Sequence, residues 1–282
     1  MTIKQAYSKI KAMFSEKGFD APDFEALSLI NYVTGFDRHS LIAHGENKLE
    51  NSKEDFLFSL VQKRLSHIPL QYILGEWSFY GFDFTVGEGV LIPRDDTEVV
   101  VNLCLDFLKD RTDKKVIDLC AGSGAISVVL SKLADADVTA VELSEKAFEY
   151  LDKNIRSNNA DVNAVKGDIL SCYADFDDEK YDLIVSNPPY IKSEDIPTLQ
   201  DEVQFEPEMA LDGGVSGFDF YESIIENWSA KLKDGGALAF ELGENQAEYV
   251  SALMKEKGFV NIRTELDLGG VRRAIIGTIM KK

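Results

Sequence analysis

From residue 115 onward, short apolar segments alternate with segments of helical periodicity, and this alternation restricts the possible folds more than any other feature. The first unit, residues 116–130 (VIDLCAGSGAISVVL), has the pattern of a strand, a glycine-containing turn and a helix. Strands that alternate with helices form parallel sheets, because a parallel neighbour is reached only through a crossover. We predict seven strands here, at residues 116–119, 138–141, 163–166, 181–185, 237–240, 259–264 and 274–279.

The last two predicted strands differ from the others in their connection. A short link that contains Gly269 and Gly270 joins them. This link is too short for a parallel crossover, so we predict that the pair is antiparallel. The predicted fold class is α/β: a doubly wound, mostly parallel, seven-stranded Rossmann-like sheet, whose ligands bind beyond the carboxyl ends of its strands.

The chain before this sheet divides into two parts. Residues 1–74 have apolar residues at helical spacing, which predicts a small helical bundle. Within it, Ser52 with Asp55 three residues later resembles a capping box at the start of a helix. Residues 75–93 are rich in aromatic and β-branched residues with interspersed glycines, which predicts a linking β-hairpin. Residues 94–282 would form the main domain.

Charge and composition narrow the possible partners. The formal net charge is −19, from 49 acidic and 30 basic residues, whereas enzymes of duplex DNA usually carry a basic surface for phosphates. No apolar run approaches the ~20 residues of a membrane span, and the first residues lack a signal-peptide pattern. The three cysteines have the spacing of neither a disulfide framework nor a zinc site. We expect a cytoplasmic monomer that binds no nucleic acid, membrane or metal.

The turn after the first predicted strand has the character of a cofactor loop. It contains Gly122 and Gly124, where the backbone can pass close to a ligand. Ser127 occupies the place of the third glycine of a dinucleotide fingerprint, which argues against NAD. The next strand ends in Glu142, whose carboxylate is placed to accept hydrogen bonds from both hydroxyls of a ribose. The alternative for Glu142 is a surface acid near a helix N-terminus.

Two further carboxylates lie at the ends of predicted strands. Asp168 follows the third strand, where it suits the exocyclic amine of an adenine or, alternatively, forms a turn. Asp118 lies near the end of the first strand and could orient either the glycine loop or the amine of a methionine group. The residues alone leave both choices open.

The most specific feature of the chain is Asn187-Pro188-Pro189-Tyr190, directly after the fourth predicted strand. A random tetrapeptide of this kind would be a strand end broken by prolines. Here it is expected to lie beside the glycine loop, because the carboxyl ends of the first and fourth strands should meet. That position favours a function.

The chemistry of these residues suits a planar, conjugated NH₂ group, which is a poor nucleophile because its lone pair is delocalised. The Asn187 oxygen and the Pro188 carbonyl can each accept one N–H, and the prolines stiffen the loop. Tyr190 offers a flat face to the planar group. The set fits methyl transfer from S-adenosyl-L-methionine to such a nitrogen, with S-adenosyl-L-homocysteine as product. Alignment and electrostatics would carry the catalysis.

At these residues the sequence resembles the HemK/PrmC-type methyltransferases, which modify the glutamine of the Gly-Gly-Gln motif in class 1 peptide-chain release factors. The resemblance covers essentially the whole chain. The element Asn-Pro-Pro-Tyr is shared with DNA adenine methyltransferases, whereas the hairpin and the EPEMALDGG stretch point to the glutamine family. The segments that carry it are PLQYILGEWSFYGFDF, GVLIPRDDTE, DLCAGSGAI, VSNPPYI, EPEMALDGGVSGFDFY, LKDGGALAFELGENQ and GGVRRAIIG.

The resemblance implies roles for particular residues. Glu142 would bind the ribose, Asp168 and Ile169 would flank the adenine, and residues 187–190 would hold the glutamine amide, with Asn187 also facing the cofactor. Residues 1–74 would be the docking surface for the release factor. The loop in contact with the cofactor, together with Asp118, would comprise Cys120, Ala121, Gly122, Ser123 and Gly124.

The sequence departs from the family pattern at three places. Cys120 stands where the family commonly has glycine, so the first turn of the loop must accommodate a side chain. Asp95 and Asp96 replace the usual Pro-Glu, and Val271 stands where an acidic residue is common.

Two other functions are compatible with parts of this pattern. A DNA or RNA amino-methyltransferase would use the same Asn-Pro-Pro-Tyr chemistry, but it would need a base-flipping pocket and a sizeable recognition domain. A non-catalytic adaptor that only binds the cofactor would have no need for both Asn187 and Tyr190.

Overall fold

The computed structural model describes residues 1–281, which pack as two units. One unit comprises Met1–Gly75 together with the short segment Asp201–Phe205, and the other comprises Glu76–Gln200 and the chain from Glu206 onward. The sequence carried no signal that we recognised for the second segment of the helical unit. Each unit is described below by itself.

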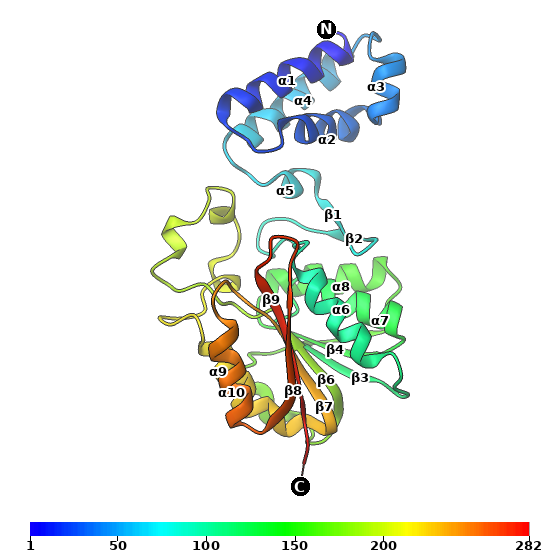
Figure 1. Cartoon of the computed structure of the whole chain (residues 1–282). Helices are drawn as coiled ribbons and strands as arrows, with labels where there is room; N and C mark the ends of the chain where they lie inside the picture. Colours follow the sequence, from blue (N-terminus) through cyan, green and yellow to red (C-terminus); the bar gives the residue numbers. More distant parts are fainter. Residues whose placement is uncertain (282) are drawn as a thin grey trace. The chain divides into compact units, whose positions relative to one another are not determined.

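The first unit is a bundle of helices around its own apolar core. Buried residues of the three long helices supply most of this core, among them Phe14, Leu29 and Leu57. Each long helix therefore has one apolar face turned inward, as the helical spacing predicted. The helices are α1 (Ile3–Lys17), α2 (Pro22–Thr34), α3 (Arg38–His44), α4 (Asn51–Leu65) and α5 (Leu70–Leu74) (Figure 1).

The predicted capping box at Ser52 is wrong. Helix α4 begins one residue earlier, and its N-cap residue, Glu50, makes no capping hydrogen bond through its side chain. The capping box of this unit lies at α1, where the Thr2 hydroxyl accepts from the Gln5 amide and the Gln5 side chain accepts from the Thr2 amide. A serine followed by an acid at the right spacing is ambiguous, because a helix that starts earlier leaves both side chains on its first turn.

A buried arginine holds the two segments of this unit together. Arg64 is almost completely buried, and its guanidinium donates to both carboxylate oxygens of Glu25, at 2.5 and 3.0 Å. It also pairs with Glu202 and lies 4.0 Å from the centre of the Phe19 ring. This bidentate geometry offsets the desolvation of the charges, and it anchors the Asp201–Phe205 segment on the helices.

Loss of this arginine should therefore destabilise the helical unit strongly. We predict that Arg64→Met lowers its free energy of unfolding by about 3 kcal/mol, because Glu25 is left buried without a partner. Urea unfolding of the full chain, followed by far-ultraviolet circular dichroism, measures the change. Lys4→Met is the matched control, since the Lys4–Glu46 pair is largely exposed and should matter little. Equal stability of the two variants would contradict the prediction.

The second unit is built on a seven-stranded sheet of order β5-β4-β3-β6-β7-β9-β8. The ladders from β5 to β7 are parallel, whereas β9 is antiparallel to both of its neighbours. The predicted mostly parallel sheet and its antiparallel last pair are thus confirmed. The strands are β3 (Lys115–Leu119), β4 (Asp137–Glu142), β5 (Val162–Lys166), β6 (Tyr181–Ser186), β7 (Leu232–Glu241), β8 (Phe259–Leu266) and β9 (Arg272–Ile279).

Helices cover both faces of this sheet (Figure 1). Successive strand residues alternate between the two resulting cores: Val116 belongs to one and Ile117 to the other. Strands buried on both sides read as continuous apolar runs, which is why they could be located from sequence. Helices α6 (Thr97–Leu108), α7 (Ala125–Ala134) and α8 (Glu145–Ser157) pack on one face, and α9 (Asp219–Trp228) and α10 (Ala247–Glu256) on the other.

The predicted hairpin is present as β1 (Glu76–Phe79) and β2 (Phe82–Thr85). Its two-residue turn has both residues, Tyr80 and Gly81, at positive φ, which matches the right-handed twist of the strands. The aromatic rings of Phe79 and Phe84 are buried in the same core as α6 and α7. The hairpin is therefore packed into the second unit.

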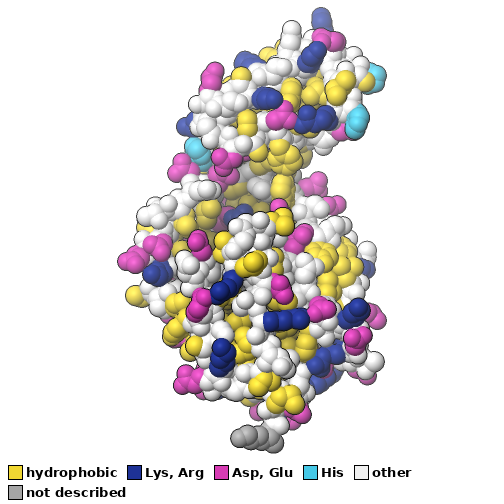
Figure 2. Space-filling model, in the orientation of Figure 1, with side chains coloured by type: hydrophobic (Ala, Val, Ile, Leu, Met, Phe, Trp, Pro, Cys, Tyr) yellow, Lys and Arg dark blue, Asp and Glu magenta, His cyan; other side chains and the backbone are white. Residues whose placement is uncertain are grey.

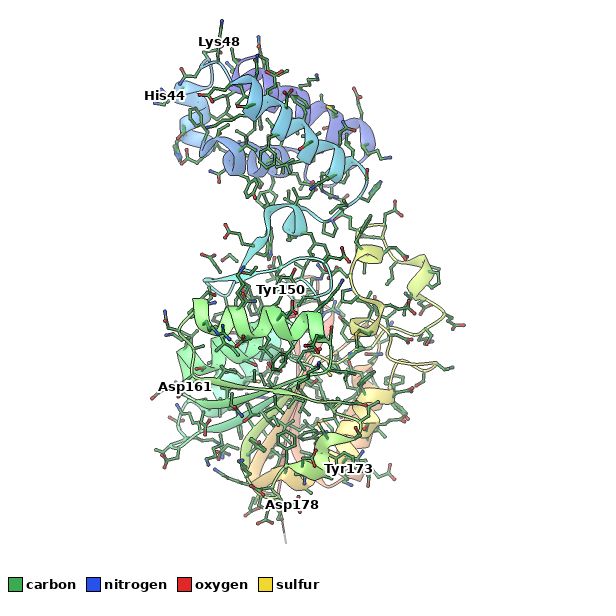
Figure 3. The ribbon with its side chains drawn as sticks, turned by 180° about the vertical axis from the view of Figure 1, so that it is seen from behind. His44, Lys48, Tyr150, Asp161, Tyr173 and Asp178 are labelled. Atoms are coloured by element: carbon green, nitrogen blue, oxygen red, sulfur yellow. The ribbon has the colours of Figure 1, made fainter. Side chains whose placement is uncertain are left out.

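Loops with single turns of 3₁₀-helix follow β6 along the chain. These turns are Ile196–Thr198, Val203–Phe205 and Glu208–Ala210. Asp161, which is labelled in Figure 3, marks the amino end of β5. Within residues 1–281, no helix is both long and apolar enough to cross a membrane.

Candidate active site

The site forms where the chain order of the strands reverses. After β3 the chain moves outward to β4 and β5, and it then returns to place β6 on the other side of β3. Leu119 is paired with Ser186 across this junction, and the Ser186 hydroxyl donates to the Leu119 carbonyl at 2.6 Å. The two strands end level, so the glycine loop and Asn187 leave the sheet side by side, as a ligand site at a switch point requires.

The glycine loop contains three residues with left-handed backbone. Their φ values are 63° at Cys120, 56° at Gly122 and 83° at Gly124. A side chain at Gly124 would come within 2.6 Å of Leu151, whereas one at Gly122 would meet only open space. Gly124 therefore allows close packing against α8, and Gly122 leaves room for a ligand. Ala121 and Ser123 lie between them and are buried.

Glu142, at the end of β4, is joined to this loop. Its carboxylate accepts from the Gly122 amide at 2.8 Å and from the Ser144 amide at 2.7 Å. Burial raises the pKa of Glu142, although these hydrogen bonds oppose the effect. A carboxylate has about four acceptor positions, so Glu142 keeps capacity for two ribose hydroxyls while it holds the loop.

Asp118 lies below the loop in β3 and is fully buried. Its Oδ2 atom accepts from the Ser127 hydroxyl at 2.5 Å, so the serine that occupies the place of a third glycine supports this acid. Its Oδ1 atom is the one buried side-chain oxygen or nitrogen in residues 1–281 without a hydrogen-bond partner. Burial raises the pKa of Asp118 to about 7. Such an atom suits a cationic ligand group, which would satisfy it and favour its ionised form.

A cavity with an empty volume of about 660 Å³, partly open to solvent, lies over these strand ends. Asp168 lines it and also forms a turn, because its carboxylate accepts from the Leu170 amide at 2.9 Å. The geometry of Asp168 is therefore compatible with both roles considered for it, a contact to an adenine amine and the formation of a turn. The predicted residues on its wall are Cys120, Gly122, Glu142, Asp168, Ile169, Asn187 and Pro189.

The Asn-Pro-Pro-Tyr segment is fixed by partners from two other elements. The Asn187 amide nitrogen lies 3.5 Å from the Thr97 hydroxyl, at the start of α6. The Tyr190 hydroxyl donates at 3.2 Å to Glu241, the last residue of β7. Pro188 is buried, and Tyr190 lies outside the wall of the cavity that Asn187 helps to form. Burial and the neighbouring Glu241 raise the pKa of Tyr190, so its hydroxyl remains a donor.

Glycines surround Tyr190 closely and give two of the segments that resemble the family a structural role. A side chain at Gly213 or Gly217 would come within 2.8 Å of the Tyr190 backbone, and one at Gly243 within 2.9 Å of its ring. Gln246 completes this enclosure, since its side-chain amide donates to the Tyr190 carbonyl at 2.9 Å. Residues of the EPEMALDGGVSGFDFY and FELGENQ segments thus pack closely around Tyr190 and hold the tetrapeptide in place.

A further ion pair ties the loop before α6 to the loop after β6. Arg94 pairs with Glu206, whose second carboxylate oxygen accepts from the Ile92 amide at 3.0 Å. The loop that Glu206 begins supplies Pro207, Met209 and Ala210 to the cavity wall. This pair therefore holds one side of the cavity.

Four of these partners were missed in the sequence: Thr97, Glu206, Glu241 and Gln246. All four lie in segments that resemble the family, but no spacing in the sequence links them to Asn187 or Tyr190. Their role depends on strands and loops that meet only in the folded chain.

The departures from the family pattern have structural counterparts. Cys120 adopts a left-handed backbone, which is the conformation that glycine takes most easily. Asp96 lies 3.4 Å from the Arg273 guanidinium, which gives this replacement an ion-pair partner. Val271 contributes its backbone amide to Asp267 at 2.9 Å.

The fold, a family model and the full-length relatives named below together define the class. The crystal structure of a methyltransferase from Pyrococcus furiosus superposes with a TM-score of 0.54 at 22% identity, covering 72% of this chain and 92% of that one, which shows a shared fold. The methyltransferase small domain model matches residues 93–204. The protein is an S-adenosylmethionine-dependent methyltransferase.

Relatives along the full length identify the family. A release factor glutamine methyltransferase from Clostridium acetobutylicum is 36% identical over 280 residues, which is 98% of each chain. One from Geobacter sulfurreducens is 38% identical and covers 99% of this chain and 97% of its own. The PrmC N-terminal domain model matches residues 5–75. The chain belongs to the release factor glutamine methyltransferase family.

The backbone at Cys120 gives a testable prediction. Cys120→Gly should keep the affinity for S-adenosylmethionine within about threefold of wild type, because glycine adopts this φ without strain. Cys120→Val should weaken binding by at least about tenfold, since a β-branched residue is an outlier at positive φ and would distort the loop. Titration calorimetry compares the two variants. Equal affinities would show that the loop does not depend on this conformation.

Proposed function

We propose that the protein transfers a methyl group from S-adenosyl-L-methionine to the side-chain amide nitrogen of the glutamine in the Gly-Gly-Gln motif of class 1 release factors. The observation that carries the proposal is the position of Asn187, which leaves the sheet beside the glycine loop and lines the same cavity as Glu142. Full-length relatives that bear this name support the choice of substrate. The substrate is a translation factor, so we place the reaction in the cytoplasm.

The residues of the cavity, together with Asp118 in β3 below the glycine loop, suit the proposed cofactor group by group. Glu142 would accept from the ribose hydroxyls, and Asp168 with Ile169 would flank the adenine. Asp118 offers its unpartnered buried oxygen to the positively charged methionine amine. The left-handed backbone at Gly122 leaves open space in front of the loop. These assignments also account for the direction of the Asp118 and Glu142 pKa shifts, since carboxylates held buried for a ligand are costly without it.

The remaining residues suit a glutamine amide. The Asn187 oxygen and the Pro188 carbonyl would accept its two N–H groups, and Tyr190 would border its planar face. When bound, S-adenosylmethionine supplies a methyl group activated by a positively charged sulfur. The protein residues would hold the amide nitrogen in line with that methyl group and exclude water, which are the contributions expected where no covalent intermediate is needed.

The helical bundle, residues 1–74, is proposed to dock the release factor. Selection of one exposed glutamine among many needs contacts remote from the amide. The bundle has exposed apolar side chains that its own core does not use, including Ile42 and Phe56. All residues assigned to the site come from one chain, so the proposal needs no second copy.

An amino-methyltransferase of DNA or RNA is the alternative, and the charge disfavours it. The chain has 49 acidic and 30 basic residues. On the face seen in Figure 2, Lys and Arg side chains are interspersed with Asp and Glu and form no continuous basic patch. Phosphate backbones attract concentrated positive charge, so this face offers little to nucleic acid.

One assay tests the proposal. Wild-type protein with labelled S-adenosylmethionine should label a purified class 1 release factor and leave plasmid DNA and RNA unlabelled. Asn187→Ala should abolish the labelling, because the Pro188 carbonyl alone cannot fix the orientation of the amide, while the affinity for S-adenosylmethionine falls by less than about tenfold. Scintillation counting and titration calorimetry supply the two measurements.

Asn187→Asp is the control for shape, since it keeps the size of the side chain and adds a charge. It should be inactive as well, because the charge is costly beside a bound amide. Unimpaired turnover by Asn187→Ala would remove the tetrapeptide from the mechanism. Labelled nucleic acid with an unlabelled release factor would replace the proposed substrate.

The docking role predicts a selective effect on the intact substrate. Ile42→Asp combined with Phe56→Asp should raise KM for the intact release factor by about tenfold and leave KM for a short Gly-Gly-Gln peptide unchanged. Steady-state kinetics on both substrates measures the split. Met280→Asp, at an exposed apolar residue of the other unit, is the matched control. A loss of equal size on the peptide would contradict docking by the bundle.

A further inference from the structure

We propose that Thr97 and Glu241 are positioning residues that orient the side chains of Asn187 and Tyr190 for the reaction. The inference rests on the proposed function, because it assigns Asn187 the task of accepting an N–H of the substrate amide. It concerns two residues that contact the tetrapeptide from other elements, α6 and β7, and that touch the substrate only through it.

The hydroxyl of Thr97 determines which way the Asn187 amide faces. A hydroxyl has one proton, and Thr97 donates it to the Glu241 carboxylate at 2.6 Å. Only lone pairs of the Thr97 oxygen then remain for Asn187. The group of Asn187 that lies 3.5 Å from it is the amide nitrogen, which can donate to those lone pairs.

The opposite orientation of Asn187 would set its carbonyl oxygen against a hydroxyl oxygen that has no proton left to give. That arrangement brings two acceptors together and leaves both unsatisfied. The hydrogen bond from Thr97 to Glu241 and the contact of the Asn187 nitrogen with Thr97 therefore leave the Asn187 oxygen free for the substrate. The long Asn187–Thr97 contact is of the kind that tightens when a substrate is bound.

The same carboxylate holds the other end of the tetrapeptide. One oxygen of Glu241 accepts from Thr97, and the other accepts from the Tyr190 hydroxyl at 3.2 Å. One buried acid thus orients both the amide that grips the substrate and the ring that borders it. Tyr221 and Gln246 fix the backbone around it, since the Tyr221 hydroxyl lies 2.9 Å from the Glu241 carbonyl.

Glu241 acts in this way only while it is ionised, because only the carboxylate accepts from both hydroxyls. The pKa of Glu241 is raised to about 7, chiefly by burial and also by Asp96, although Thr97, Arg273 and Tyr190 partly oppose the rise. Below pH 7 the acid gains a proton that it can donate to Thr97. Thr97 would then turn its own proton toward Asn187 and favour the wrong face of the amide.

The test uses the full chain at pH 8.5 with the intact release factor. Thr97→Val keeps the shape of the side chain and removes the hydroxyl, so kcat should fall on the order of 10- to 100-fold while KM and the affinity for S-adenosylmethionine stay within about threefold. Thr97→Ser should recover kcat to within about threefold of wild type. Thr264→Val, on the edge strand β8, is the matched control. Circular dichroism checks that each variant is folded.

A second variant keeps the inference open to refutation if Thr97→Val does not fold. Glu241→Gln should lower kcat similarly and make the fall in kcat between about pH 8 and pH 6 smaller than in wild type. Asp118 also has its pKa near 7, so only the difference between the two profiles belongs to Glu241.

The outcomes separate this inference from the proposed function. Full kcat in Thr97→Val, or failure of Thr97→Ser to recover it, would overturn the positioning role while release-factor labelling by wild type stands. An unchanged pH profile in Glu241→Gln would also overturn it. Absence of labelling by wild type would instead overturn the proposed function, and with it the premise of the inference.

Discussion

The pairing of β3 with β6 is the constraint on which the rest of the site depends. Because Leu119 lies opposite Ser186, both strands end at the same level and their following loops share one cavity. The parallel ladder transmits any shift directly, since a change of one residue in register would reverse the faces of every side chain in β6. Both cores of the sheet oppose such a shift, as Leu183 belongs to one and Ile184 to the other.

Buried carboxylates surround this junction, and each is stabilised by different groups. Glu142 is held by backbone amides, Asp118 by one serine hydroxyl, and Glu241 by the hydroxyls of Thr97 and Tyr190. All three have raised pKa values because burial disfavours their charge. Buried acids of this kind are costly to the folded state, and the roles that we propose for them in binding and orientation account for their presence at the ends of these strands.

Much of the fold was predictable because its signals are local. Apolar runs located all seven strands to within a few residues, and the short Gly269-Gly270 link predicted the antiparallel last pair. Prediction failed where the same local sequence is compatible with more than one structure, such as two different starting residues for a helix. The Ser52–Asp55 pattern predicts a helix cap, although α4 begins earlier in the chain. The ion pair between Arg64 and Glu202 joins residues 138 positions apart, and no periodicity reports such a contact.

For the site, the sequence by itself determined which residues could do the chemistry: the glycine loop, Glu142, Asp168 and the Asn-Pro-Pro-Tyr tetrapeptide all stand at ends of predicted strands. The ends of the strands can be located from the sequence, because apolar runs stop there and turn-forming residues begin. Only the tertiary structure decided what holds these residues in place. Thr97 lies in α6 and Glu241 in β7, and they contact Asn187 and Tyr190 only in the folded chain. A hydrogen bond between such elements depends on the order and register of the strands. No local sequence pattern determines that order or register.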